Sequence, residues 1–279
     1  MTPAARIEAL TGRRVAGLQP LSGGCVGEVL LATLADGGRL VAKLGPGLEP
    51  EGWMLGELAR RSRLPLPAVI HGDDDLLLME WIDAGDPLDA AAQQHAAELL
   101  AGLHAVGWHA FGLERDTVIA GLRQPNPPTG RWLDFFRDHR LLFMAHEAHR
   151  AGHLPAAVLA KVERLAGRLE RWIDEPEQPS LIHGDCWAGN VLVRAGRVAA
   201  FIDPAIHFAD PEIELAFGTL FGTFGAPFFR RYAEIRPIKD GFFEVRRDLY
   251  NLYPQLVHVR LFGGGYVGDV ESVVERLSG

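Results

Sequence analysis

Three side chains in one stretch of this sequence could together hold a metal ion and accept a proton. Asp185 and Asn190 lie five positions apart in a segment that also contains Gly184 and Gly189, which favours a tight loop. Asp203 follows thirteen residues after Asn190, at the end of the next apolar run. Two carboxylates and an amide oxygen form a set of hard oxygen ligands, which suits Mg²⁺ bound to a phosphate chain and suits zinc poorly.

The order of these side chains is typical of enzymes that transfer phosphoryl groups. In kinases a base Asp is followed by an Asn that binds the metal and then by a second Asp that also binds it. We therefore expect Asp185 to be the base and Asn190 and Asp203 to hold Mg²⁺. A single Asp in a loop is more often a turn former or a helix cap, but the ordered set of three is far more specific than any one member.

A glycine-rich turn near the N-terminus could bind phosphate. Ser22-Gly23-Gly24-Cys25 separates two predicted strands, 15–21 and 28–34. Glycines let backbone N–H groups approach phosphate oxygens closely, and the Ser22 hydroxyl adds a donor. Glycines are also common in plain hairpins, and the turn lacks the G-x-G-x-x-G spacing of protein kinases. The prediction of a phosphate contact therefore depends on the lysine that follows.

That lysine is Lys43, on the third predicted strand, 39–44. A lysine placed after a glycine-rich loop in this way is in the position that pairs with the α- and β-phosphates of a nucleotide. We expect its acidic partner on the next helix, with Glu51 as the first choice and Glu57 as the second. The alternative for each of these residues is an ordinary solvated charge on the surface of a strand or helix.

The end of the fifth predicted strand, 76–81, is the expected place for the nucleobase. In a kinase-type cleft, backbone groups of the segment that joins the two lobes read the base. We therefore expect the carbonyl of Glu80 and the N–H of Ile82 to contact adenine, and Met79 to line the pocket. The alternative for Met79 is plain core packing, which is the commoner role of methionine in a strand.

The pattern along the chain predicts an α+β protein in two parts. Residues 1–82 contain a short helix opened by Thr2 and Pro3, five strands of an antiparallel sheet, and one further helix after position 49. Residues 83–279 are expected to be mainly helical around the catalytic stretch, with Asp86 as the first cap of this part. Helices are predicted at 86–104, 132–148, 158–173, 240–262 and 266–277.

Composition limits the class of protein and its partners. The chain has 279 residues, 48% of them hydrophobic and 23% charged, which is ordinary for a globular enzyme. A net charge of −8 argues against a nucleic-acid partner because no basic field is available to collect phosphates. Two cysteines exclude a disulfide scaffold. We see neither a signal peptide nor a membrane span, so a cytoplasmic location is expected.

The motifs resemble the fructosamine kinase (ketosamine-3-kinase) family, within the aminoglycoside phosphotransferase and choline kinase-like group of the protein-kinase-like superfamily. The resemblance runs nearly end to end. It is carried by Leu21-Ser22-Gly23-Gly24-Cys25, by His183-Gly184-Asp185-Cys186-Trp187-Ala188-Gly189-Asn190, and by Ile202-Asp203-Pro204-Ala205. The chain departs from the family at Cys186, where Leu is usual, and at Ala188, where Ser is usual.

The resemblance implies a bilobal protein-kinase-like fold, with an N-lobe at 1–82 and a C-lobe at 83–279. It implies ATP- and Mg²⁺-dependent phosphorylation of the 3-hydroxyl of a ketosamine, either a ribulosamine or a fructosamine, as a step in the repair of glycated amines. It places Trp187 near the sugar. It also suggests that Cys25 forms an intermolecular disulfide as a redox switch, so a monomer or a redox-linked homodimer is expected. The alternative for Cys25 is a small residue packed in a turn.

Two other functions stay open at this point. The acceptor could be an aminoglycoside, a choline-like compound or another small alcohol, and the net charge of −8 permits a cationic acceptor without identifying one. The chain could also be a nucleotide-binding pseudokinase. Such proteins usually lack the base, the metal-binding Asp or the lysine, and all three are present here.

Overall fold

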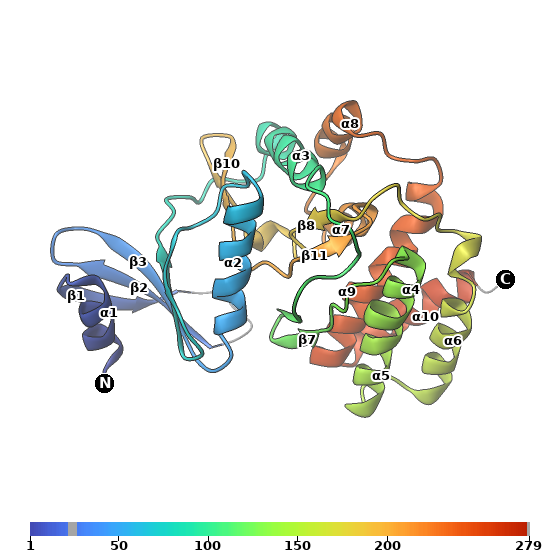
Figure 1. Cartoon of the computed structure of the whole chain (residues 1–279), viewed down its shortest axis with the longest axis horizontal. Coiled ribbons are helices and arrows are strands. Elements are labelled where there is room, and N and C mark those ends of the chain that lie inside the picture. The colour runs from blue at the N-terminus through green and yellow to red at the C-terminus, as the bar shows by residue number, and fades with distance from the viewer. Residues whose placement is uncertain (22–26, 278–279) are drawn as a thin grey trace.

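The structure is a computed structural model that describes residues 1–21 and 27–277. Figure 1 shows a sheet with two helices at one end of the molecule and a larger, mainly helical part at the other. The boundary between the lobes, at 82/83, stays a prediction. Among the residues that the structure describes, no helix has both the length and the apolar character that crossing a membrane requires.

The N-terminal sheet has five strands in the order β1-β2-β3-β5-β4, and every neighbouring pair is antiparallel. This confirms the predicted five-stranded antiparallel sheet. The turn at 35–38 joins β2 to β3, and Gly37 takes φ +86° there, in the region that favours glycine. The strands are β1 (Val15–Pro20), β2 (Glu28–Leu34), β3 (Arg39–Leu44), β4 (Val69–Gly72) and β5 (Leu76–Glu80).

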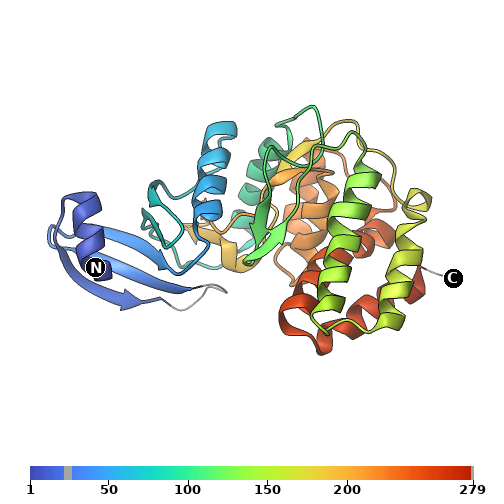
Figure 2. The ribbon, with the colours of Figure 1, turned by 60° about the horizontal axis from the view of Figure 1, so that its bottom comes forward.

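Two helices cover the two faces of this sheet. Helix α1 (Pro3–Thr11) begins as predicted, because the hydroxyl of Thr2 accepts the N–H of Ala5 and Pro3 stands in the first turn. It buries Ile7 in a small core with β2, β3 and β5. Helix α2 (Glu49–Arg61) lies on the other face, on the side of the helical part (Figure 2).

Helix α2 belongs to two cores at once. Its Leu55 packs with Leu77 and Met79 of the sheet. Its Met54 and Leu58 are buried in the large core of the C-terminal part. Because one helix contributes to both cores, its position is set by packing on either side, and any acid that it carries is held at a fixed height above the sheet.

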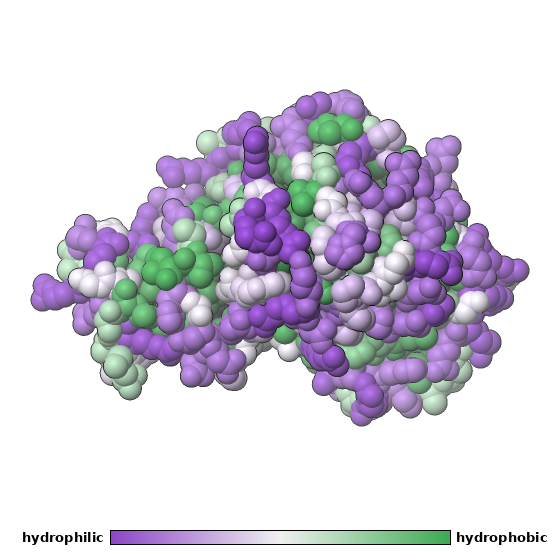
Figure 3. Space-filling view, in the orientation of Figure 1, coloured by the Kyte–Doolittle hydropathy of each residue, from purple (hydrophilic) through white to green (hydrophobic). Residues whose placement is uncertain are grey.

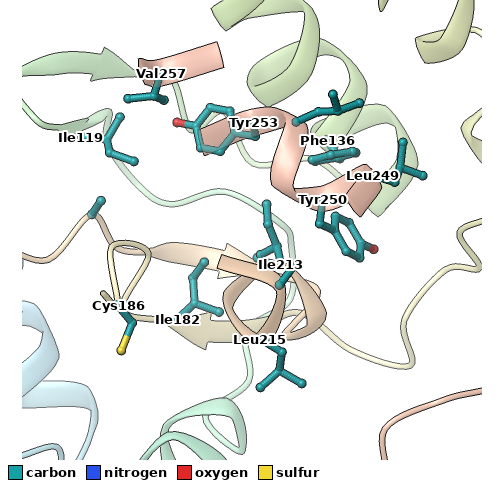
Figure 4. Close-up of a cluster of buried hydrophobic side chains, with 14 of the residues drawn as sticks. Ile119, Phe136, Ile182, Cys186, Ile213, Leu215, Leu249, Tyr250, Tyr253 and Val257 are labelled. Carbon is teal, nitrogen blue, oxygen red and sulfur yellow. The ribbon is translucent and has the colours of Figure 1, made fainter. Parts of the chain in front are cut away.

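The C-terminal part combines helices with three two-stranded sheets. β6 pairs with β7, β8 with β11, and β9 with β10. Figure 4 shows residues from α7, α9 and β8 in one buried cluster, among them Ile213, Tyr253 and Ile182. The helices are α3 (Ala90–His104), α4 (Trp132–Phe136), α5 (Leu142–Arg150), α6 (Ala156–Ala166), α7 (Glu212–Leu220), α8 (Ala226–Ile235), α9 (Arg247–Phe262) and α10 (Gly265–Arg276). The strands are β6 (Thr117–Ile119), β7 (Leu122–Gln124), β8 (Ser180–Ile182), β9 (Val191–Arg194), β10 (Arg197–Phe201) and β11 (His207–Ala209).

The structure corrects several predicted elements. α3 begins at Ala90 and is capped by Asp89, whose carboxylate accepts the N–H of Ala92 at 2.9 Å. Asp86, the predicted cap, instead accepts the N–H of Ala195 from the β9–β10 turn at 2.5 Å. The hairpin β6–β7 and the strand β11 were missed because each strand has only three residues, which is too short for a periodic signal.

Two of the predicted long helices contain a change of helical type. The helix predicted at 132–148 is interrupted by a π-helical turn at Arg137–Leu141, and the one predicted at 240–262 begins with a π-helical turn at Phe242–Arg246. The helix predicted at 158–173 ends at Ala166 and is followed by a 3₁₀ turn, Leu169–Arg171. Apolar periodicity placed these segments correctly but does not resolve such local changes.

Candidate active site

The loop between β8 and β9 can form only because Gly184 has no side chain. Gly184 has φ +85°, and a Cβ there would lie 2.1 Å from the carbonyl oxygen of Ala205. The close approach brings the segment after β10 directly against the loop. Asp185 follows at once, and the short helical turn Ala188–Asn190 carries the chain into β9.

Asp185 and Asn190 are in direct contact within this loop. The Nδ2 of Asn190 donates to the backbone carbonyl of Asp185 at 2.8 Å and to its Oδ2 at 3.0 Å. Asn190 is 4% exposed, and Asp185 is partly buried. Because both Nδ2 donors are used here, the amide oxygen of Asn190 stays available as an acceptor or a metal ligand.

Asp203 lies beside this pair at the end of β10. Its backbone takes φ +53°, which is uncommon for a residue other than glycine. The preceding residue, Ile202, donates its N–H to the carbonyl of Asn190 at 3.1 Å. The two predicted metal ligands therefore sit on backbone segments that are hydrogen-bonded to each other.

Lys43 joins the two parts of the molecule at this point. Its Nζ donates to Asp203 at 2.5 Å and to Glu51 of α2 at 2.7 Å. Burial by itself lowers the pKa of Lys43, but the two carboxylates outweigh it and the pKa is raised, so the ammonium stays charged. Glu57, the second choice of partner, pairs with Arg60 and Arg61 instead.

Asp185 has the electrostatic environment of a group that exchanges protons near neutral pH. Burial raises the pKa of its carboxyl to about 7, and the nearby carboxylate of Asp203 adds to the shift. The hydrogen bond from Asn190 acts in the opposite direction. A carboxylate with such a pKa is suited to accept a proton from a substrate alcohol.

A buried acid on α7, to which the sequence analysis assigned no role, holds this loop in place. The carboxylate of Glu214 accepts the N–H of Gly184 at 2.7 Å and that of His183 at 3.2 Å. It also bonds Nε2 of His104 at 2.8 Å, whose Nδ1 bonds the hydroxyl of Tyr232. The one available signal was an acid in a helix whose other residues are mostly apolar. Both ring nitrogens of His104, at the end of α3, have hydrogen-bond partners.

The donor set at Asn190 and Asp203 fits Mg²⁺ bound to a nucleotide. Within residues 1–21 and 27–277, no cluster of three or more His, Cys, Asp or Glu side chains has a metal-binding arrangement. A protein-only metal centre of that kind is thus not found there. One carboxylate and one amide oxygen are the sparse protein contribution that is usual for Mg²⁺ when substrate phosphates supply further oxygens.

The remaining predicted site residues have different surroundings. Met79 is 3% exposed and packs with α2. Glu80 ends β5, and Ile82 follows in the connection to α3. Trp187 is 43% exposed, and its ring lies against Gly189. Ser22, Gly23, Gly24 and Cys25 lie outside the described residues.

Comparisons with known proteins agree with a kinase site of this geometry. The sequence model of the fructosamine kinase family matches residues 43–278. The chain belongs to this family. A protein of Synechocystis that is provisionally assigned as a ketoamine kinase is 34% identical, over 99% of this chain and 95% of its own length. The chloroplastic protein-ribulosamine 3-kinase of indica rice is 30% identical, over 94% of this chain and 79% of its own.

Solved structures of this kinase family and of a distant relative have the same fold. The crystal structure of a protein from Thermobifida fusca, provisionally assigned as a fructosamine-3-kinase, matches with a TM-score of 0.86 and 33% identity over 99% of each chain. A mutant aminoglycoside phosphotransferase in complex with ADP and hygromycin B matches with a TM-score of 0.71 at 20% identity over 100% of each chain. The second match supports the fold alone, which is the predicted bilobal α+β fold of protein-kinase-like phosphotransferases.

Proposed function

We propose that this fructosamine kinase family member is an ATP-dependent kinase that phosphorylates the 3-hydroxyl of a ketosamine. The observation that carries the proposal is the double contact of Lys43 with Glu51 and Asp203. It joins a phosphate-anchoring pair to the predicted metal ligand, next to a carboxyl whose pKa is about 7. A pseudokinase has no need of this complete set.

Each residue has a defined part in the proposed reaction. Asp185 accepts the hydrogen bond of the acceptor hydroxyl and orients it in line with the γ-phosphate. Lys43, held by Glu51, binds the phosphates from the N-terminal side. Catalysis of this type depends mainly on positioning and on electrostatic stabilisation, since little covalent chemistry falls to the protein.

Nucleotide binding combines the remaining predictions. Asp203 and the amide oxygen of Asn190 would hold Mg²⁺, which supplies neutralisation of the negative charge on the phosphate oxygens. The carbonyl of Glu80 and the N–H of Ile82 contact adenine, with Met79 behind them. The phosphate contact expected of Ser22, Gly23 and Gly24 stays a prediction, because these residues lie outside the described part of the chain.

The acceptor is inferred from the family and from the exposed aromatic residue of the loop. The relatives named as ketoamine and ribulosamine kinases act, by their names, on a sugar joined to an amine. Trp187 projects from the catalytic loop and is 43% exposed, so its ring is available to stack on a sugar. The cytoplasmic location and a redox role for Cys25 in a homodimer stay predictions.

A kinase assay over a small acceptor panel tests the proposal. The purified protein is incubated with ATP, Mg²⁺ and either ribulose-lysine, fructose-lysine or kanamycin, and the position of the new phosphate is read by NMR. We expect phosphate on the 3-hydroxyl of a ketosamine and no turnover of kanamycin. Preferred turnover of kanamycin would assign the chain to another acceptor class, and absence of turnover with every acceptor would contradict the proposed activity.

A further inference from the structure

A buried glutamine in β7 connects the segment that follows Asp203 to strand β6 and helix α9. Gln124, at the end of β7, is 1% exposed. Its Nε2 donates to the carbonyl of Ala205 at 3.0 Å and to the hydroxyl of Thr117 in β6 at 2.9 Å. Its Oε1 accepts the hydroxyl proton of Tyr253 in α9 at 2.8 Å. Both ends of the amide are therefore engaged.

The partners of Gln124 fix which end of its amide faces the loop. Tyr253 donates to the oxygen, so the nitrogen must point toward Ala205. Burial raises the pKa of Tyr253 to about 12, which keeps its hydroxyl protonated and able to donate. With the orientation defined on one side by Tyr253 and on the other by Thr117, the amide is a rigid donor to the loop.

The carbonyl of Ala205, which accepts the hydrogen bond of Gln124, is two residues from Asp203 and lies directly against Gly184. The N–H of Ala205 donates to the carbonyl of His183 at 2.8 Å, and the oxygen of Ala205 occupies the space that a side chain at position 184 would need. The next carbonyl, that of Ile206, accepts the hydroxyl of Thr117 at 3.3 Å. The segment after Asp203 is thus bound to the catalytic loop on one side and to the β6–β7 hairpin on the other.

We propose that Gln124 is a positioning residue that sets the place of the Asp203 carboxylate by holding the backbone of Ala205. It does not touch nucleotide or acceptor. The proposal rests on the proposed function, because it gives Asp203 the role of a metal ligand. It assigns a purpose to the short β6–β7 hairpin, whose buried Thr117 and Gln124 both bond the segment that follows Asp203.

The chain offers a matched control for this proposal. Asn126 is also buried, at 1% exposure, and its amide belongs to the same polar network. It bonds Thr117 at 2.8 Å, the carbonyl of Arg115 at 3.3 Å and the buried guanidinium of Arg140 at 2.5 Å. Among the described residues, Asn126 makes no direct hydrogen bond to the segment 203–206. We therefore expect removal of the Asn126 amide to disturb the same core while Gln124 keeps its bond to Ala205.

Two measurements on Gln124→Met and Asn126→Leu test the proposal. Calorimetry gives the affinity for ADP with and without Mg²⁺, and hydrogen exchange of the nucleotide-free protein gives the protection of the peptide that covers 203–207. For Gln124→Met we expect the gain in affinity from Mg²⁺ to fall by about tenfold, because the carbonyl of Ala205 loses its hydrogen bond from the amide, with unchanged affinity in the absence of Mg²⁺. We also expect faster exchange in that peptide.

The control and a milder variant make the outcome decisive. We expect Asn126→Leu to lose stability while it keeps the gain from Mg²⁺. Tyr253→Phe, which frees the amide of Gln124 without touching the loop, should show a smaller loss than Gln124→Met and replaces it if that variant does not fold. Equal effects of the Gln124 and Asn126 variants, or no effect of the Gln124 and Tyr253 variants, would overturn the proposal. If the unaltered protein shows no gain from Mg²⁺, the proposed function fails instead.

Discussion

The carboxylate of Glu214 accepts the backbone N–H of Gly184 at 2.7 Å, across thirty positions of the chain. This bond ties α7 to the loop that carries Asp185. Glu214 is 2% exposed and also bonds His104. Burial by itself raises the pKa of Glu214, but the bond from His104 and the other contacts outweigh it and the pKa is lowered. The acid therefore stays ionised and acts as a fixed acceptor beneath the catalytic loop.

Replacing this acid should weaken both the fold and the reaction. In Glu214→Gln, an amide NH₂ would face backbone N–H groups, and a buried acceptor would be lost. We expect the free energy of unfolding to fall by roughly 2–4 kcal/mol and kcat to fall with it. Urea unfolding and steady-state kinetics measure the two effects. Glu271→Gln, at a partly exposed acid that pairs with Lys161, serves as the control, and equal behaviour of the two variants would count against the role of Glu214.

Asp185→Asn should abolish most of the turnover while nucleotide still binds. The amide keeps the size of the side chain but cannot accept a proton, so we expect kcat to fall by about 10²- to 10⁴-fold. The affinity for ADP, measured by calorimetry, should change little because Asp185 faces the acceptor. Asp269→Asn, at an exposed position of α10, controls for handling. Near-normal turnover in the Asp185 variant would refute its assignment as the base.

Glu51→Gln should act on the nucleotide side of the reaction. Without a second carboxylate, Lys43 is held by Asp203 alone and its position for the phosphates is less defined. We expect kcat/KM for ATP to fall by at least about tenfold, the cost of one charge-assisted hydrogen bond. Glu57→Gln lies on the same helix and loses ion pairs to Arg60 and Arg61 instead. If it lowers kcat/KM for ATP as much as Glu51→Gln does, then the lysine–glutamate pair has no special part.

Asp203→Ala should remove the effect of Mg²⁺ on nucleotide binding. The substitution deletes the one carboxylate of the proposed metal set, and the amide of Asn190 is too weak a ligand to hold the ion alone. Calorimetric titration with ADP should give the same affinity with and without Mg²⁺ in the variant. In the unaltered protein Mg²⁺ should strengthen binding. A variant that retains this strengthening would show that the ion is bound elsewhere.

Asp210 should make the stability of the protein depend on pH in a particular direction. Burial raises the pKa of Asp210 to about 6, and Glu212 adds to the shift. Since this folded-state value lies above the unfolded one, protonated Asp210 stabilises the fold at low pH, and the contribution is lost as the pH rises through about 6. Its carboxyl accepts the hydroxyl of Tyr250 and the N–H of Glu212.

Asp210→Asn tests this dependence because the amide does not titrate. Between pH 4 and pH 8 the unaltered protein should lose roughly 2–3 kcal/mol of unfolding free energy relative to the variant. Urea unfolding at several pH values gives the two curves. Parallel curves over this range would show that Asp210 does not change its protonation state there.

Part of the site follows from sequence alone because its contacts are local. Asp185 and Asn190 are five residues apart on a loop that glycine permits, so a contact between them is expected from the local sequence. Asp203 reaches them through one hairpin, β9–β10, and hairpins are set by short-range pattern. The β1–β2–β3 meander and the β4–β5 hairpin of the N-terminal sheet are predictable for the same reason, whereas the pairing of β3 with β5 joins them across α2.

Other features were decided only by the tertiary structure. Asp86, the predicted cap, accepts the N–H of Ala195, more than a hundred residues away, and Asp89 caps α3 in its place. Glu214 and Gln124 show no pattern of their own, because each acts on a backbone group that packing alone brings near. Lys43 meets Asp203 across 160 positions. Side-chain type and spacing determine what chemistry a residue can do. The packing of one lobe against the other determines which residues lie together in one site, because contacts between distant parts of the chain depend on the packing of the whole chain.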